Sequence, residues 1–341
     1  MDRSADKPIA VLGAGSWGTA LAILLSGNGY PVRLWGHLRE EIQALAQARE
    51  NKQFLPGIPF PDSLQPEPDL RQALSGASEI LIAVPSHAFR HVAATVAPGL
   101  QGEPGIVWAT KGFEPGTRRL LSEVAAEQLP GRDLAVISGP TFAGEVARGL
   151  PTAVTVAGST RQHAEGVANL LHTPWFRAYT SDDLVGVQVG GACKNVLAIA
   201  AGIADGLGFG ANTRAALITR GLTEIMRLGL NLGGKAETFM GLAGLGDLVL
   251  TCTDNQSRNR RMGLALAEGI SLDAARERIG QEVEGLNTAR EVYRLARRQG
   301  VEMPISEQVY RVLYDGLEPK AAVHNLLERS QKAEAPFTAP P

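Results

Sequence analysis

Features that would point to a secreted, membrane-bound or nucleic-acid-binding protein are scarce in this sequence. Its 341 residues include two cysteines, Cys193 and Cys252, which provide neither a disulfide framework nor a zinc site and favour a reducing compartment. The formal net charge of -2 gives no general attraction to polynucleotides or anionic lipids. Residues 1–7 are polar and contain no apolar signal core, so we expect a cytoplasmic protein.

Signals for metal ligands and membrane spans are also weak. His87 and His91 have the i, i+4 spacing of a metal-binding pair, but no third ligand is evident nearby, so we predict no metal. Residues 184–204 are apolar and long enough to cross a bilayer, with Lys194 as their only charge. The central lysine and four glycines reduce the hydrophobicity and predict a buried helix of a globular domain rather than an integral membrane segment.

Glycine, by contrast, is abundant at 39 residues, and three near the N-terminus form the pattern G-x-G-x-x-G. Residues 9–12 predict a buried parallel strand, a helix is expected after the glycines, and 32–35 predict a second strand. Gly13 permits a sharp turn, Gly15 lets the backbone approach a pyrophosphate, and Gly18 allows close helix packing. The pattern therefore predicts a dinucleotide-binding site.

The residues after the second strand bear on which dinucleotide is bound. NAD-selective sites usually have an acidic residue there for the ribose hydroxyls. This chain instead has Gly36, His37, Leu38 and Arg39. His37 and Arg39 suit a 2′-phosphate, although either could be a solvated loop residue. We therefore predict NADPH or NADP as the favoured cofactor and NADH or NAD as the alternative.

The order of predicted elements divides the chain in two. Further strands are predicted at 80–84, 106–110, 134–137 and 152–156, in alternation with helices. This alternation is typical of a Rossmann-type doubly wound α/β sheet. From about Ser181, alanine- and leucine-rich helical segments replace the strands. We expect a dinucleotide-binding domain at 1–180, a mostly α-helical substrate and catalytic domain at 181–332, and a disordered tail at 333–341.

Lys194 is the strongest candidate for catalysis. An ammonium buried near Gly190, Gly191 and Val196 is costly unless its charge is paired or functional. Burial would lower its pKa and suit it to give a proton to a carbonyl oxygen while hydride reaches the carbon. The alternative is a lysine whose ammonium reaches the helix surface. Cys193 projects about 100° away on a helix and is expected to pack.

Polar residues elsewhere could complete a site. Lys111 follows a predicted strand beside a glycine and is placed to meet an anion, unless it is an ordinary surface lysine. Asp247 lies in a glycine-flanked segment and could hold Lys194 or accept from substrate hydroxyls. Ser257, Arg258 and Asn259 offer a hydroxyl, a guanidinium and an amide at a predicted helix start, which suits a phosphate or a polyol. A solvated basic face is the alternative for the arginine.

Together these motifs resemble the bacterial-type NAD(P)-dependent glycerol-3-phosphate dehydrogenase family over nearly the whole chain. The matching segments are 13–22, 110–112, 138–143, 190–195, 244–248 and 257–260. The resemblance implies reduction of dihydroxyacetone phosphate to sn-glycerol 3-phosphate for glycerophospholipid synthesis, by a cytoplasmic homodimer. Cys193 and Glu282 stand where apolar residues are expected in relatives, and neither should abolish activity.

The resemblance also implies residue roles. Lys194 falls on the family's general acid/base. The positions implied as cofactor contacts are Ser16, Trp17, His37, Ala143 and Glu284, those near both ligands are Lys111 and Arg258, and those implied as substrate contacts are Gly139, Thr141, Asp247, Ser257 and Asn259.

Two other functions stay open. A β-hydroxyacid dehydrogenase also joins a dinucleotide domain to a helical one, but such proteins usually separate the lysine and asparagine that are adjacent here as Lys194 and Asn195. A nucleotide-sensing or nucleic-acid-binding protein could use Arg258, Arg260 and Arg261. The modest net charge and the lack of aromatic residues among these arginines count against it.

Overall fold

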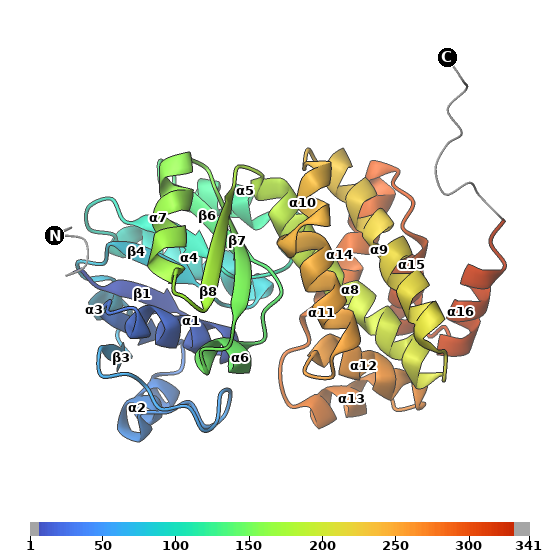
Figure 1. Ribbon diagram of the computed structural model, residues 1–341, viewed down its shortest axis with the longest axis horizontal. Coiled ribbons are helices and arrows are strands. Elements are labelled where there is room, and N and C mark those ends of the chain that lie inside the picture. The colour runs from blue at the N-terminus through green and yellow to red at the C-terminus, as the bar shows by residue number, and fades with distance from the viewer. Residues whose placement is uncertain (1–6, 331–341) are drawn as a thin grey trace, which may run out of the picture.

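The computed structural model describes residues 7–330, and the first half of this range forms an eight-stranded sheet (Figure 1). Its strand order is β3-β2-β1-β4-β5-β6-β7-β8, and every neighbouring pair is parallel except β6 with β7. The strands are β1 (Ile9–Leu12), β2 (Val32–Trp35), β3 (Leu64–Pro66), β4 (Glu79–Ile82), β5 (Gly105–Trp108), β6 (Leu134–Ser138), β7 (Thr152–Gly158) and β8 (Phe176–Ser181). The predicted doubly wound α/β fold is confirmed.

Helices cover both faces of this sheet. They are α1 (Ser16–Gly27), α2 (Arg39–Ala48), α3 (Leu70–Leu74), α4 (Ser86–Val96), α5 (Leu121–Gln128), α6 (Ala143–Ala147) and α7 (Arg161–Leu171), with a 3₁₀ turn η1 (Ala97–Gly99). Ile9 and Val11 of β1 pack in the core beneath α1 and α7, whereas Ala10 and Leu12 pack in the core beneath α4 and α5. A strand buried on both faces needs a continuous apolar sequence, which explains the run at 9–12.

Two strands were not predicted, and both lie at the edges of the sheet. β3 has three residues and ends in a proline, and most residues of β8 are half-buried or exposed. An edge strand is only partly buried, so it needs no long apolar run, and it pairs on one side only, so it tolerates a proline without a backbone N–H. The sequence pattern therefore identified the central strands and missed those at the margins.

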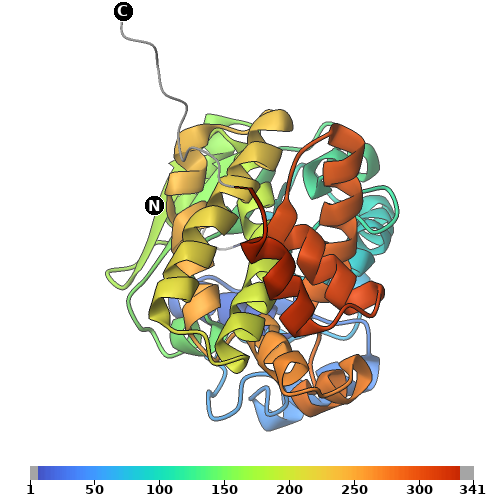
Figure 2. The ribbon, with the colours of Figure 1, turned by 90° about the vertical axis from the view of Figure 1, so that its right-hand side faces the viewer.

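The second half of the described chain is entirely helical, from Leu184 onward. Its elements are α8 (Leu184–Gly206), α9 (Ala211–Asn231), α10 (Ala236–Met240), a π-helical turn η2 (Leu242–Gly246), α11 (Asp247–Thr253), α12 (Arg258–Ala267), α13 (Leu272–Ile279), α14 (Glu284–Gln299), α15 (Pro304–Tyr314) and α16 (Pro319–Leu327). Figure 1 shows this half beside the sheet, and Figure 2 views it from its far end. The tail expected at 333–341 lies outside the described residues.

Helix α8 is the central element of the helical half. It packs against α9, α11, α12, α14 and α15. It is also long and apolar enough to cross a membrane by length and composition, yet 89% of its most hydrophobic window is buried inside the molecule. Burial by its neighbours accounts for its hydrophobicity.

Candidate functional site

Two adjoining cavities lie between the sheet and the helical half. The larger has a volume of about 1270 Å³ and extends from the loops after β1, β2 and β4 to α13 and the start of α14. The smaller, of about 730 Å³, lies between the loops after β5 and β6 and helices α8, α11 and α12. Ser16, Trp17, Arg258 and Glu284 line both cavities. The two spaces therefore meet near the start of α1.

The glycine pattern forms the wall of the larger cavity next to α1. Gly13 has a φ of +119°, and a Cβ atom there would lie 2.5 Å from the Ala83 carbonyl oxygen. Gly18 packs so closely that its Cβ would lie 1.9 Å from the Gly13 oxygen. Gly15, in contrast, has no atom within 4 Å of where a Cβ would stand. Two glycines are thus required by packing, and the third leaves the N-terminus of α1 open.

Beyond the glycines, the end of β2 lines the same cavity. His37 is exposed there and lines the cavity with Glu41 of α2. Arg39 opens α2 and is not among the residues that line the cavity. Of the two side chains predicted to suit a 2′-phosphate, the structure therefore brings only His37 to the cavity wall.

At the smaller cavity, two lysines share one buried carboxylate. Lys194 Nζ donates to Asp247 Oδ1 and, at 2.9 Å, to Thr251 Oγ1. Lys111 Nζ donates to Asp247 Oδ2 at 2.5 Å. Asp247 is fully buried and Lys194 is 6% exposed. The Lys194 side chain thus ends inside the molecule, at the cavity wall, rather than at the outer surface of α8.

The surroundings of Lys194 alter its acidity. Burial lowers the pKa of the Lys194 ammonium to about 8, because the charged form loses hydration. The Asp247 carboxylate opposes this shift, and the Lys111 ammonium adds to it by repulsion. Cys193 next to it is fully buried, and burial raises the pKa of its thiol, so the residue packs in the core as predicted.

Close helix packing brings the start of α12 to Lys194. A Cβ on Gly202 of α8 would lie 2.1 Å from the Arg260 carbonyl oxygen, and one on Gly263 of α12 would lie 2.1 Å from that of Ile199. Only glycine permits this separation of the two backbones. The contact fixes α12 against α8, the helix that carries Lys194.

Amide side chains link α8, α12 and α14 beside the lysine. Asn259 Nδ2 donates to Asn195 Oδ1 at 2.9 Å, and Asn259 Oδ1 accepts from the Gly285 backbone at 2.9 Å. Asn195 Nδ2 donates to Glu284 Oε2 at 3.2 Å. Because these bonds fix the Asn195 and Glu284 side chains, both keep defined orientations at the wall of the smaller cavity.

The start of α12 presents the predicted polar group to the smaller cavity. Ser257 Oγ accepts the Arg260 backbone N–H at 3.2 Å and caps the helix. Arg260 Nη1 donates to Asp205 at 2.5 Å, so its charge is paired in the interior. Arg258 has no carboxylate partner within residues 7–330 and lines both cavities. Arg260 is therefore unavailable as part of a basic binding face.

The loop after β6 lines the opposite wall of the smaller cavity. Thr141 and Ala143 line it, and Thr141 Oγ1 donates to the Gly139 carbonyl at 3.2 Å. Gly139 also accepts from Lys111 Nζ at 3.4 Å. Neither Gly139 nor the buried Asp247 is among the lining residues, so the structure places both behind the cavity wall.

Thr251 was not predicted as part of the site. It lies one helical turn after Asp247 on α11, and both side chains meet Lys194. An Asp and a Thr at i, i+4 in an otherwise apolar segment is a signal that could have identified it. His87 and His91 line the larger cavity, and no group of three His, Cys, Asp or Glu that could hold a metal occurs within residues 7–330.

Comparison with family models gives two matches. Residues 8–164 match the model of the NAD-dependent glycerol-3-phosphate dehydrogenase N-terminus, and residues 183–324 match that of its C-terminus. The first match covers the sheet half from β1 to β7, and the second covers the helical half from α8 into α16.

Curated and solved relatives match nearly the whole chain. It is 58% identical to glycerol-3-phosphate dehydrogenase [NAD(P)+] of Methylococcus capsulatus over 328 residues, which covers 96% of this chain and 98% of the relative. The enzyme of that name from Shewanella halifaxensis is 57% identical, with 98% of each chain covered. The crystal structure of glycerol-3-phosphate dehydrogenase from Coxiella burnetii superposes with a TM-score of 0.93 at 51% identity, covering 95% of this chain and 99% of that one.

Proposed function

Because the chain belongs to the NAD-dependent glycerol-3-phosphate dehydrogenase family, we propose that it reduces dihydroxyacetone phosphate to sn-glycerol 3-phosphate with NADPH or NADH, and catalyses the reverse reaction. The observation that carries the proposal is the buried Lys194 ammonium, held by Asp247 where helix α8 reaches the wall of the smaller cavity. A proton donor of this kind is what carbonyl reduction requires in addition to a hydride.

The larger cavity suits a dinucleotide. The N-terminus of α1 opens at Gly15 without a side-chain cap and without an acidic residue in its first turn. Free backbone N–H groups at a helix N-terminus favour a pyrophosphate. We assign the cofactor contacts to Gly13, Gly15, Ser16, Trp17, Gly18, His37, Lys111, Ala143, Arg258 and Glu284, with His37 next to a 2′-phosphate. The bound cofactor supplies the hydride that reaches the substrate carbonyl carbon.

Lys194 then supplies the proton. As hydride adds to the carbonyl carbon, the Lys194 ammonium gives its proton to the carbonyl oxygen, and the alkoxide never accumulates. Asp247 holds the ammonium toward the cavity, and Thr251 accepts a second N–H at 2.9 Å. The lysine left neutral takes a proton back from solvent before the next turnover. In the reverse direction the neutral lysine accepts the alcohol proton.

The start of α12 is assigned to the substrate phosphate. Arg258 has no carboxylate partner among residues 7–330, and Ser257 and Asn259 line the smaller cavity beside it. A guanidinium combined with a helix N-terminus favours a doubly charged phosphate. We assign Lys111, Gly139, Thr141 and Asp247 to the substrate end of the site, the last acting from behind Lys194.

The same proposal has a cellular side. Residues 1–180 would bind cofactor and residues 181–332 substrate, in a cytoplasmic homodimer that supplies sn-glycerol 3-phosphate for glycerophospholipid synthesis. The family resemblance supports this part of the proposal.

The first test is a spectrophotometric assay of purified protein. Dihydroxyacetone phosphate is mixed with NADPH, and separately with NADH, and the loss of reduced-nicotinamide absorbance is followed. We expect loss with both and a faster rate with NADPH. Folded protein that consumes neither cofactor would rule out this function, and 3-hydroxy acids would then be tested as substrates. Salt-dependent binding to a polynucleotide without turnover would instead favour the nucleic-acid alternative.

A further inference from the structure

The segment between β5 and α5, residues 109–120, belongs to both halves of the molecule. Near its start, Thr110 Oγ1 donates to the Val84 carbonyl in the sheet half at 2.7 Å. Farther along, Phe113 is 1% exposed and packs in the core of the helical half together with Leu120. Lys111 lies between these two attachments. Its position at Asp247 therefore depends on how firmly the segment is held.

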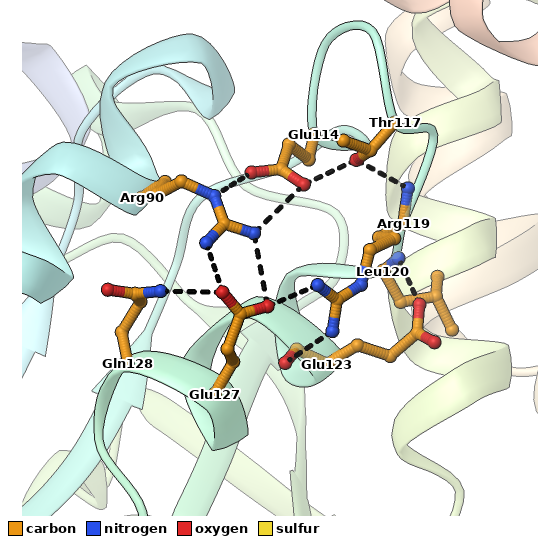
Figure 3. Close-up of polar contacts among 8 residues, drawn as sticks. All are labelled: Arg90, Glu114, Thr117, Arg119, Leu120, Glu123, Glu127 and Gln128. Atoms are coloured by element: carbon orange, nitrogen blue, oxygen red, sulfur yellow. Dashed lines mark hydrogen bonds and ion pairs between the residues drawn. The ribbon is translucent and has the colours of Figure 1, made fainter.

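A network of charged side chains holds this segment to the dinucleotide half (Figure 3). Arg90 of α4 lies between two carboxylates: it donates to Glu114 through Nε, with a second contact of 3.3 Å from Nη2. It also donates to Glu127 of α5, at 2.5 Å from Nη1 and 3.3 Å from Nη2. Thr117 Oγ1 donates to Glu114, and Arg119 Nη1 donates to Glu127. One guanidinium thus links α4, the segment and α5.

This network differs from an ordinary surface ion pair. The Glu114 side chain is only 8% exposed, so its carboxylate has lost most of its water and depends on Arg90 and Thr117. The Arg90 guanidinium holds the pKa of Glu114 below its usual range by hydrogen bonding. Paired contacts from a planar guanidinium also fix the orientation of the carboxylate that accepts them, whereas a single exposed ion pair does not.

Helix α5, which directly follows the segment, is tied to the helix that carries Lys194. The Ser122 backbone N–H donates to Gln188 Oε1 at 2.9 Å, and Gln188 Nε2 donates to Ser122 Oγ at 2.9 Å. Gln188 is on α8, within two turns of Lys194. Arg90 therefore holds the segment at Glu114, and Gln188 fixes α5 just beyond the end of the segment.

Resting on the function proposed above, we propose that Arg90 is a positioning residue for the reaction: by holding Glu114, it keeps the 109–120 segment where the Lys111 ammonium contacts Asp247 beside Lys194. Arg90 lines neither of the two cavities. It acts through the segment and not by contact with substrate or cofactor.

Loss of this support has a distinctive consequence at Lys194. The charged groups that contact Lys194 or its ion-pair partner are Asp247 from α11, behind the cavity wall, and Lys111 from the segment. The other charged residues that line the smaller cavity are Arg148, Asp254, Arg258, Arg261, Glu282 and Glu284. When Lys111 moves away, a repelling cation is lost and Asp247 acts on Lys194 alone, so the pKa of Lys194 rises. Reduction requires the ammonium, so the alkaline decline in kcat then occurs at higher pH.

The test compares Arg90→Ala with three other variants in kcat and KM for dihydroxyacetone phosphate across neutral and alkaline pH. Arg90→Ala is expected to lower kcat about 10-fold and to move the alkaline decline upward by up to about one pH unit. Arg90→Lys keeps the positive charge but cannot make the paired contacts of a guanidinium, so its kcat and pH profile should lie between those of Arg90→Ala and wild type. Arg119→Ala should have a smaller effect. Arg161→Ala removes the exposed pair with Glu165 on α7 and should leave both quantities unchanged.

The outcomes separate positioning from simple stabilisation. A lower melting temperature for Arg90→Ala with an unmoved pH profile and unchanged kcat would overturn the proposal. If Arg90→Ala does not fold, Glu114→Gln is used, because it removes the carboxylate charge that Arg90 holds while keeping the size of this buried side chain; an upward shift supports the proposal and no shift overturns it. If the wild type is active and the variants have the same kcat and pH profile as the wild type, only the positioning role is overturned. An inactive wild type overturns the proposed function and this role with it.

Discussion

The two ends of the site are built in opposite ways. The dinucleotide end is defined by missing side chains: Gly13 and Gly18 pack against backbone atoms, and Gly15 leaves open space before α1. The Lys194 end is defined by buried charges that hold one another, with Asp247 between two ammonium groups. Adding atoms at the glycines should therefore impair stability and cofactor binding, whereas removing the charged group of Lys194 should impair turnover. Each prediction below tests one side of this difference.

The largest effect is expected from Lys194→Ala. If Lys194 is the proton donor, kcat for reduction falls by about 10²–10⁴, whereas cofactor affinity changes little because the glycine loop is untouched. Steady-state kinetics and cofactor titration by fluorescence measure the two quantities. The matched control is Lys235→Ala, which removes an exposed lysine paired with Asp182 and should leave kcat unchanged.

The pH profile provides a second measure of the same role. The pKa of Lys194 is lowered to about 8 by burial, so the ammonium needed for reduction is lost as pH rises through that value. Wild-type kcat for reduction should therefore decline above about pH 8, and the residual activity of Lys194→Ala should lack this decline. Nearly intact turnover in the variant, or an unchanged profile, would mean that another group gives the proton.

At the other end, Gly18→Ala adds a single methyl group. Its Cβ would lie 1.9 Å from the Gly13 oxygen, so α1 must move away from the turn. Overpacking of this kind lowers the free energy of unfolding by about 1–3 kcal/mol, and displacement of α1 should also weaken cofactor binding. Urea unfolding and cofactor titration test both effects.

Gly27→Ala is the control on the same helix. No atom lies within 4 Å of a Cβ at Gly27, so the added methyl meets nothing and stability should be unchanged or slightly higher. Equal behaviour of the two variants would show that the close approach at Gly18 does not constrain α1.

The contrast also explains what could be read from the sequence. Gly13, Gly15 and Gly18 lie within one turn and one helix start, so their spacing alone predicts their geometry. Lys194 stood out because a charge within an apolar helix is costly. Thr251, Arg90 and the edge strand β8 were missed, because their importance arises from contacts between segments far apart in the chain. Arg90 and Glu114, for example, are 24 residues apart, and neither lies in a pattern that marks a site.

The smallest effect is expected at His37, where we place the 2′-phosphate on the adenosine side of the cofactor. His37 is an exposed side chain at the wall of the larger cavity, so His37→Ala should leave the fold intact and reduce the preference for NADPH over NADH, measured as the ratio of kcat/KM values, by about fivefold. His172→Ala, at an exposed histidine after α7, should leave the ratio unchanged. An unchanged ratio in His37→Ala would place 2′-phosphate recognition elsewhere. A ratio lowered through NADPH alone would show that backbone contacts bind the part common to both cofactors, while one exposed side chain distinguishes them.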